Sequence, residues 1–266
     1  MADYSLTLSD SEIRRYRLMA DAAERREREL WTTAGAGPGA RIADVGCGPG
    51  AVAVRLARLA APDGAVWAVD RDAGALAVAS ALAERSGVAV RTGLAPAERT
   101  GLDAGAFDLV MMRHVLAHNG GHEQAIVDHL ATLARPGGGT VYLVDVDISS
   151  SGLRNAPPAF DEMHELYGEL HRRRGDDLNI GTRLDELLVA AGLDLVVFEG
   201  HIDVVTPPPG MRGPAWAARE ALVAEGLATL DDVARWDAAL REAEEEVGSG
   251  GRRFFAAHFV AVGRRP

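Results

Sequence analysis

The stretch RIADVGCGPG, residues 41–50, decides the fold. It begins as a short apolar run typical of a buried strand and ends in a glycine-rich turn, which leads into a helix-like segment near 50–61. Glycines at 46, 48 and 50 allow a sharp turn and a close approach to a ligand, because no Cβ stands in the way. The stretch therefore predicts a ligand-binding turn between the first strand and the first helix of an α/β domain.

Strand-like and helix-like segments alternate through the next hundred residues. After the first strand, further apolar runs are AVWAVD (65–70), VAVRTG (88–93), FDLVMMRH (107–114) and GTVYLVDVD (139–147). Helix-length connections separate them, with helices expected near 73–86 and 121–134. Short apolar strands joined by helices are typical of a parallel sheet covered on both faces, so we predict a doubly wound α/β domain.

Both ends of the chain add helical segments to this pattern. Residues 9–31 lack Gly and Pro and predict an amphipathic helix, and 34–41 predict a turn-rich linker. After Asp147 the stretch SSSGLRNAPP predicts a loop, followed by a helix at about 158–174. Thr182 is expected to cap the next helix and Gly192 to end it before another strand. TPPPGMRGP is a second break, one or two charged helices are expected over about 214–246, and RRFFAAHFVAVGRR predicts a final strand.

Composition narrows the classes of partner. The 266 residues hold 28 Lys+Arg against 39 Asp+Glu, a net charge of −11 that disfavours binding to nucleic acid or anionic membranes. All the basic residues are Arg, as in GC-rich bacterial genomes. Cys47 alone cannot form an internal disulfide or a thiolate metal site. With neither a signal-like start nor an apolar run of about 20 residues, a soluble cytoplasmic protein is expected.

The glycine spacing and Asp70 indicate which ligand the turn binds. The G-x-G-x-G pattern differs from the G-x-G-x-x-G of dinucleotide enzymes, which favours a nucleoside without phosphates. Asp70 ends the second strand, where its carboxylate can accept hydrogen bonds from both hydroxyls of a ribose.

The motifs DVGCGPG, AVDRD, FDLVMMRHVL and LARPGGG together resemble the class I, Rossmann-like S-adenosylmethionine-dependent methyltransferases. The likeness covers residues 40–147 firmly, and IGTRLDELLVAAGL is similar to a small-molecule subgroup. It implies a mostly parallel seven-stranded sheet with a helical lid, an N-terminal helical cap at 1–36, and a methyltransferase domain at 37–266 with a lid insertion at about 150–180 and a helical segment at about 210–246. The cofactor would be S-adenosylmethionine and its product S-adenosylhomocysteine.

By matching position, the resemblance places the cofactor on two groups of residues. Asp44, the loop backbone and Arg113 face the methionine part, and Asp70 with Arg71 holds the ribose. Many relatives carry an acidic residue after the third strand that contacts adenine, whereas this chain has Leu94 and Ala95 there. The expected cofactor-binding residues are therefore Asp44, Gly46, Cys47, Gly48, Gly50, Asp70, Arg71, Leu94, Ala95 and Arg113.

The acceptor is expected to be a small, partly apolar metabolite of secondary metabolism, methylated on O, N or C. Because a sulfonium is already a strong methyl donor, the enzyme mainly has to hold the acceptor in line in a dry pocket. If the acceptor needs a base, His118 and then His114 are the candidates, since both follow the fourth strand. The expected pocket wall consists of Tyr16, Phe160, Met163, His164 and Tyr167, with core packing as the alternative.

Several alternatives stay open from the sequence. Arginines in HRRRGDD (171–177) could bind an anionic acceptor, although such a run is usually a solvated helix face. No metal-ligand spacing stands out. The oligomeric state is open, although lid helices of this kind often form the dimer surface in similar proteins, which makes a homodimer an option. The rival functions are a non-methylating reaction in the same fold, such as cyclisation or decarboxylation, a nicotinamide oxidoreductase, and a non-catalytic regulatory protein that binds the cofactor.

Overall fold

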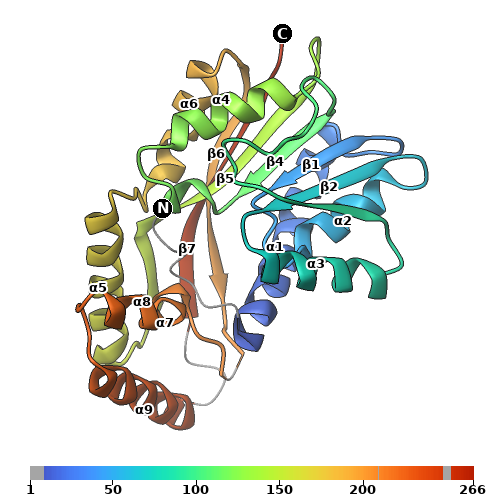
Figure 1. Ribbon diagram of the computed structural model, residues 1–266. Coiled ribbons are helices and arrows are strands. Elements are labelled where there is room, and N and C mark those ends of the chain that lie inside the picture. The colour runs from blue at the N-terminus through green and yellow to red at the C-terminus, as the bar shows by residue number, and fades with distance from the viewer. Residues whose placement is uncertain (1–8, 209, 248–252) are drawn as a thin grey trace.

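A seven-stranded sheet runs through the middle of the protein (Figure 1). The computed structural model describes residues 9–208, 210–247 and 253–266. The order across the sheet is β3-β2-β1-β4-β5-β7-β6. The strands are β1 (Arg41–Val45), β2 (Ala65–Asp70), β3 (Val90–Leu94), β4 (Leu109–Arg113), β5 (Thr140–Arg154), β6 (Asp194–Val205) and β7 (Arg253–Arg264).

Strands β1 to β5 pair in parallel, whereas β7 lies antiparallel between β5 and β6. The chain order reverses between β1 and β4, so the carboxyl ends of these two neighbouring strands point to the same edge of the sheet. Such a switch point is where open α/β sheets bind ligands. The expected doubly wound, mostly parallel seven-stranded fold is confirmed.

Alternating side chains of the central strands feed two hydrophobic cores. In β4, Leu109 and Met111 pack on one face, while Val110 and Met112 pack on the other. The first face is covered by α1 (Asp10–Thr33), α2 (Ala51–Ala60) and α3 (Ala73–Arg85), and the second by α4 (Glu123–Leu133) and α6 (Leu184–Ala190) (Figure 1). Strands buried on both faces explain why these segments are almost continuously apolar in the sequence.

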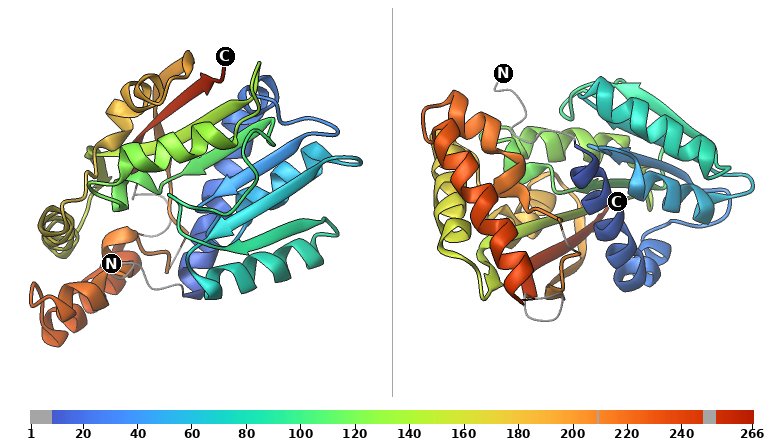
Figure 2. Two further views of the ribbon diagram at one scale, coloured as in Figure 1. Left: turned by 45° about the horizontal axis from the view of Figure 1, so that its top comes forward. Right: turned by 90° about the horizontal axis from the view of Figure 1, so that it is seen from below.

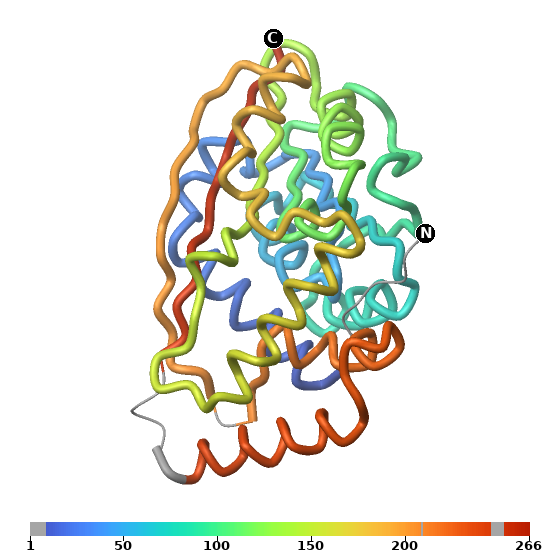
Figure 3. The backbone as a smooth tube through the Cα atoms, turned by 90° about the vertical axis from the view of Figure 1, so that its left-hand side faces the viewer, coloured from blue at the N-terminus to red at the C-terminus, as the bar shows by residue number. Residues whose placement is uncertain are grey.

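Strands β5, β6 and β7 are longer than the others and extend past the sheet as a three-stranded arm (Figures 1 and 2). Helices α5 (Pro158–Arg174), α7 (Pro214–Ala217), α8 (Arg219–Ala224) and α9 (Leu230–Val247) gather beside this arm. Figure 3 shows α9 crossing the far end of the group. Among the described residues, no helix combines the length and the apolar character that crossing a membrane requires.

Most elements lie where the sequence predicts them, and α3 and α5 match within one residue. The loop predicted over SSSGLRNAPP (149–158) is wrong for residues 149–154, which continue β5. Their backbone pairs with β7 after a bulge between Asp147 and Gly152. A Cβ on Gly152 would lie 2.7 Å from the ring of Phe255, so a glycine leaves room for that ring in the pairing with β7.

Two helix boundaries also differ from expectation. Thr182 lies in a 3-10 turn at Ile180–Arg183, where its hydroxyl donates to the Asn179 carbonyl at 2.9 Å, and it does not cap α6. The region 214–246 holds three helices, because α7 ends and α8 begins at Ala218, and the chain then turns between α8 and α9 at Gly226, whose φ is +67°. Residues on either side of that turn pack on the same core.

Candidate functional site

The glycine turn after β1 adopts a backbone that other residues rarely take. Gly46, Gly48 and Gly50 have φ values of +74°, +51° and +75°. A Cβ on Gly46 would lie 2.3 Å from a methyl of Val115, and one on Gly50 would lie 2.6 Å from the Cβ of Ala79. Both the left-handed backbone and the close packing therefore require glycine, which keeps the backbone of the turn free of side chains.

Asp70, at the carboxyl end of β2, holds the turn in place. One of its carboxylate oxygens accepts from the Gly48 N–H at 2.8 Å, and the other accepts from the Asp72 N–H at 2.9 Å. Leu94 pairs with Asp70 across β2 and β3, and the Ala95 N–H donates to the Asp70 carbonyl at 3.0 Å. Leu94 is exposed, as is Arg71. The structure thus brings these predicted ribose and adenine residues to one edge of the sheet.

Asp44, in β1, carries a buried carboxylate oxygen that has no hydrogen-bond partner among the described residues. Burial raises the pKa of this carboxyl to about 7, against the opposing influence of the Arg113 guanidinium. A small cavity of about 50 Å³ adjoins it, lined also by Gly46 and Cys47. An unpaired buried acceptor beside a cavity is suited to a bound cation or N–H donor.

Cys47 is itself buried, and burial raises the pKa of its thiol. A thiol held neutral is a poor nucleophile, so the side chain serves as a small residue that fits the turn.

Arg113, at the end of β4, forms a buried ion pair that the sequence did not predict. Its guanidinium contacts both carboxylate oxygens of Glu27 in α1. Glu27 also accepts from the Tyr142 hydroxyl at 2.9 Å and from the Trp31 indole N–H at 3.2 Å. This network fixes α1 to the sheet beside the glycine turn. Glu27 shares its helix face with Ala20, Ala23 and Trp31, and a charged residue on that buried face was the available signal.

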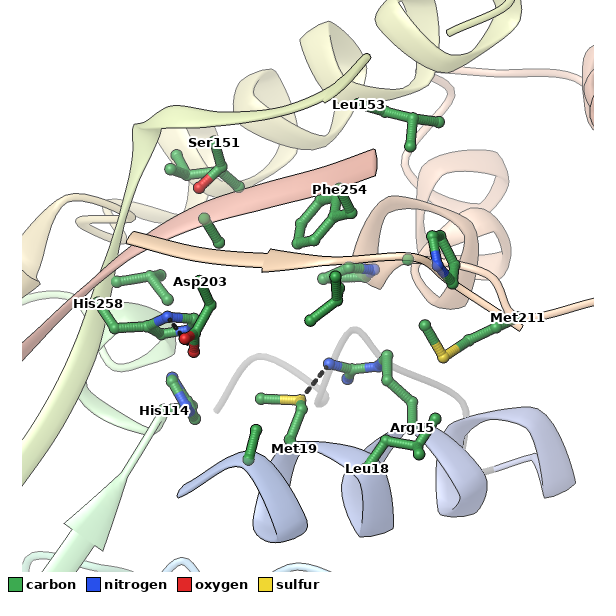
Figure 4. A pocket seen from close by; sticks show the side chains of 18 of the residues that line it. Arg15, Leu18, Met19, His114, Ser151, Leu153, Asp203, Met211, Phe254 and His258 are labelled. Carbon is green, nitrogen blue, oxygen red and sulfur yellow. Dashed lines mark hydrogen bonds and ion pairs between the residues drawn. The ribbon is translucent and has the colours of Figure 1, made fainter. Parts of the chain in front are cut away.

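A cavity of about 460 Å³ lies between α1, the arm formed by β5, β6 and β7, and helix α5. The predicted pocket residues all line it, namely Tyr16, Phe160, Met163, His164 and Tyr167. Figure 4 shows Leu18 and Met19 of α1 facing Phe254 of β7 across this space. The large and the small cavity share four lining residues, Tyr16, Met19, Arg113 and His114. The glycine turn and the large cavity therefore adjoin each other.

His114 and His118, the predicted bases, both line the large cavity. His114 has a left-handed backbone (φ +55°), and burial lowers the pKa of its imidazole well below the usual value. Burial also lowers the pKa of His118, to about 3, with the neighbouring His171 adding to the effect. Both rings are neutral near pH 7, but such low pKa values make them weak bases. Their catalytic role stays a prediction.

The arginines of HRRRGDD do not line either cavity. Arg172 and Arg173 pair with Glu169 along α5, and Arg174 pairs with Glu225 in the turn after α8. These ion pairs fit the alternative prediction, that the arginines of HRRRGDD form a solvated helix face.

The cavity wall also holds polar residues that the sequence analysis missed. Asp145 in β5 accepts from the Ala117 and Val146 N–H groups at 3.2 and 3.0 Å, and burial raises its pKa to about 7. His201 and Asp203 of β6 lie beside His258 of β7. His258 is more than fifty positions away from His201 and Asp203 in the sequence, and the pairing of β6 with β7 brings the three together. No local sequence pattern indicates such a contact.

Comparison with known proteins places the fold. The sequence model of the family described as "Methyltransferase domain" matches residues 42–138. A ubiquinone/menaquinone biosynthesis C-methyltransferase, UbiE, from Cupriavidus taiwanensis is 28% identical over 134 residues, which cover 48% of this chain and 55% of that protein. The match thus spans about half the length of this curated relative.

Two solved structures share the fold over most of the chain. A candidate methyltransferase from Bacillus halodurans has a TM-score of 0.59 at 20% identity, over 91% of this chain and 99% of that one. Geranyl diphosphate methyltransferase, solved in complex with S-adenosylmethionine, has a TM-score of 0.52 at 15% identity, over 94% and 87%.

Proposed function

We propose that this chain, whose residues 42–138 belong to the methyltransferase-domain family, transfers the methyl group of S-adenosylmethionine to a small, partly apolar acceptor. The observation that carries the proposal is the unpaired, buried oxygen of Asp44 in a small cavity that adjoins a much larger one. One cavity is suited to the methionine end of the donor, and the other to the acceptor.

The residues of the glycine turn fit S-adenosylmethionine in chemical type. The Asp44 oxygen would accept hydrogen bonds from the donor's ammonium, and Asp70 would accept from its ribose hydroxyls while still bracing Gly48. Arg71, next to Asp70, would help to hold the ribose. Leu94 and Ala95, which adjoin Asp70 at the same edge of the sheet, would face the adenine. When bound, the sulfonium supplies an activated methyl group, and S-adenosylhomocysteine is the product.

The protein's own contribution is mainly to position the acceptor. A volume of about 460 Å³ suits a drug-sized molecule, and apolar side chains such as Met163, Tyr167 and Phe254 form much of its wall. A wall of this kind excludes water and holds the accepting atom toward the four shared residues near the glycine turn. We expect an O, N or C atom of a small metabolite to be methylated there.

If the acceptor must lose a proton, Asp145 is a further candidate base. Its pKa of about 7 is better matched to neutral pH than that of His118, at about 3. Both of its oxygens accept backbone N–H groups, which fixes the carboxylate in the cavity wall.

Calorimetric titration with S-adenosylmethionine and S-adenosylhomocysteine tests the donor site, with NAD as the control ligand. We expect micromolar binding to the wild type, weakened at least about tenfold, or about 1.4 kcal/mol, in Asp70→Asn. Methyl-labelled donor and a panel of apolar phenols, amines and carbon acids then test transfer. No binding of either ligand by the wild type would overturn the proposal.

A further inference from the structure

His201, Asp203 and His258 form a compact cluster on the wall of the large cavity. His201 and Asp203 are two residues apart on β6, so their side chains leave the same face of the sheet. His258 lies directly opposite His201 in the antiparallel pairing of β6 with β7. Figure 4 shows Asp203 and His258 together at one end of the cavity, with the ring of His114 nearby.

The donor atoms of this cluster face one another without forming ordinary hydrogen bonds. His201 Nε2 lies 3.7 Å, and His258 Nδ1 3.4 Å, from the same oxygen of Asp203. His258 Nδ1 is buried and has no hydrogen-bond partner among the described residues. Hydrogen bonds of this type are usually 2.7–2.9 Å long and well aligned, so two nitrogens and one oxygen converge here without pairing closely.

A second cluster of the same composition provides the contrast. His171 Nδ1 and Asp176 lie only 2.6 Å apart, the distance of a strong hydrogen bond, with His118 beside them. That bond uses His171 Nδ1 and one oxygen of Asp176, while His171 Nε2 is buried and has no hydrogen-bond partner among the described residues. His171 and Asp176 also do not line the large cavity, whereas His201, Asp203 and His258 all do.

We propose that His201 Nε2, His258 Nδ1 and one oxygen of Asp203 bind a divalent transition-metal ion of the zinc type. Donor atoms bound at about 2.0–2.2 Å to a tetrahedral ion lie about 3.3–3.6 Å apart, close to the separations found here. Two imidazoles and one carboxylate suit zinc, iron(II) or cobalt(II) better than magnesium or calcium, which prefer oxygen ligands.

The surroundings support a site with three protein ligands. The other oxygen of Asp203 is held by the Arg26 guanidinium at 2.6 Å, which orients the carboxylate. The remaining coordination position faces the cavity, as in zinc sites that leave one position for water or substrate. If the proposed methyl transfer holds, this position would bind an oxygen or nitrogen of the acceptor. The ring of His258 lies 5.4 Å from the ring of His114, and His114 lines the small cavity together with Gly46 of the glycine turn.

Metal binding is tested on the full chain, freed of metal with a chelator, by calorimetric titration with Zn²⁺ and by the visible absorption of bound Co²⁺. We expect one ion per chain with a micromolar or tighter Kd. His201→Ala, Asp203→Asn and His258→Ala should each weaken binding at least tenfold. His171→Asn, in the second cluster, and His164→Asn, elsewhere in the cavity wall, should bind as the wild type does. Circular dichroism checks that every variant is folded.

Three results would overturn the inference: a wild type that binds neither ion below millimolar concentration, cluster variants that bind as tightly as the wild type, or a loss confined to His171→Asn. The titrations contain no S-adenosylmethionine, so they are independent of the proposed function. Donor binding without metal binding would overturn only the inference of a metal site. Metal binding without donor binding would overturn only the proposed function.

Discussion

At the scale of single residues, Asp44 links donor binding to pH. Its pKa of about 7 is that of the carboxyl in the free protein, where burial outweighs the opposing influence of the Arg113 guanidinium. The donor's ammonium would favour the ionised form, so binding should release a proton from those chains in which Asp44 is protonated. We therefore expect the affinity for S-adenosylmethionine to fall on the order of twentyfold between pH 7.5 and 5.5, measured by calorimetry at several pH values.

Asp44→Asn is the control for this prediction, because its amide does not titrate. Its donor affinity should be low and nearly constant over the same range. The stability of the protein should change with pH in the opposite direction. Because the pKa of Asp44 is higher in the folded than in the unfolded chain, its contribution to the free energy of unfolding is present at low pH and is lost as the pH rises through 7. Asp44→Asn should thus be more stable than the wild type at pH 8, on the order of 2 kcal/mol in urea unfolding. A steep pH dependence in the variant would contradict the assignment.

Residue-scale predictions from the sequence succeed where the chemistry is local. Asp44, Asp70 and the three glycines lie within one strand-turn-helix unit and its neighbour strand, so their spacing alone indicates that they meet. Glu27 and His258 could not be placed in this way. Glu27 reaches Arg113 across 86 positions, and His258 meets Asp203 only through the pairing of β6 with β7. Contacts of this kind depend on how the layers pack.

At the scale of elements, Glu27 anchors α1 to the sheet. Burial alone would raise the pKa of this carboxyl, but the Arg113 guanidinium and the hydrogen bonds around it hold the pKa below its ordinary value. Removing one partner of such a buried pair leaves the other charge without compensation. We expect Glu27→Gln to lower the free energy of unfolding by about 3–5 kcal/mol at pH 7, measured by urea denaturation.

The matched control is Glu24→Gln, one turn earlier on the same helix. Glu24 pairs with the exposed Arg28 at 2.7 Å and with Arg55 at 3.2 Å, and its loss should cost less than about 1 kcal/mol. Because the folded-state pKa of Glu27 is lowered, its contribution is present above pH 4.5 and is lost as the pH falls through the lowered value. Equal costs for the two variants at pH 7 would show that α1 is not anchored through Glu27.

Sequence patterns locate elements whose period is strong and miss those that depend on a partner. The helix predicted at about 158–174 agrees with α5, which begins at Pro158 and is followed by Gly175 in a left-handed conformation. The loop predicted over 149–158 is wrong for residues 149–154, where serines and a glycine carry no alternating apolar pattern that would indicate a strand. That stretch is a strand because β7 lies beside it, with Leu153 opposite Phe254.

At the scale of the whole molecule, α1 lies between the two cavities and forms part of the wall of each. Tyr16 and Met19 line both, Ala20 lines only the small cavity, and Ala22 lines only the large one. One helix thereby brings the glycine turn of the sheet and the arm of long strands to a common boundary. Glu27 fixes α1 to Arg113, which directly precedes the predicted base His114. We therefore expect a change in this network to move α1 and to reshape both cavities together.

Two substitutions in α1 test whether the two cavities bind different ligands. Ala20→Phe would fill the small cavity and should weaken the binding of S-adenosylmethionine at least about tenfold, since overpacking there also costs about 1–3 kcal/mol. Ala22→Phe should leave that affinity within about threefold and instead reduce the binding of an apolar fluorescent dye such as anilinonaphthalene sulfonate to the large cavity. Calorimetry and dye fluorescence measure the two effects, with thermal unfolding as the check on folding. Donor affinity lost equally in both variants would mean that the cavities are not separate sites, and the division between donor and acceptor would have to be abandoned.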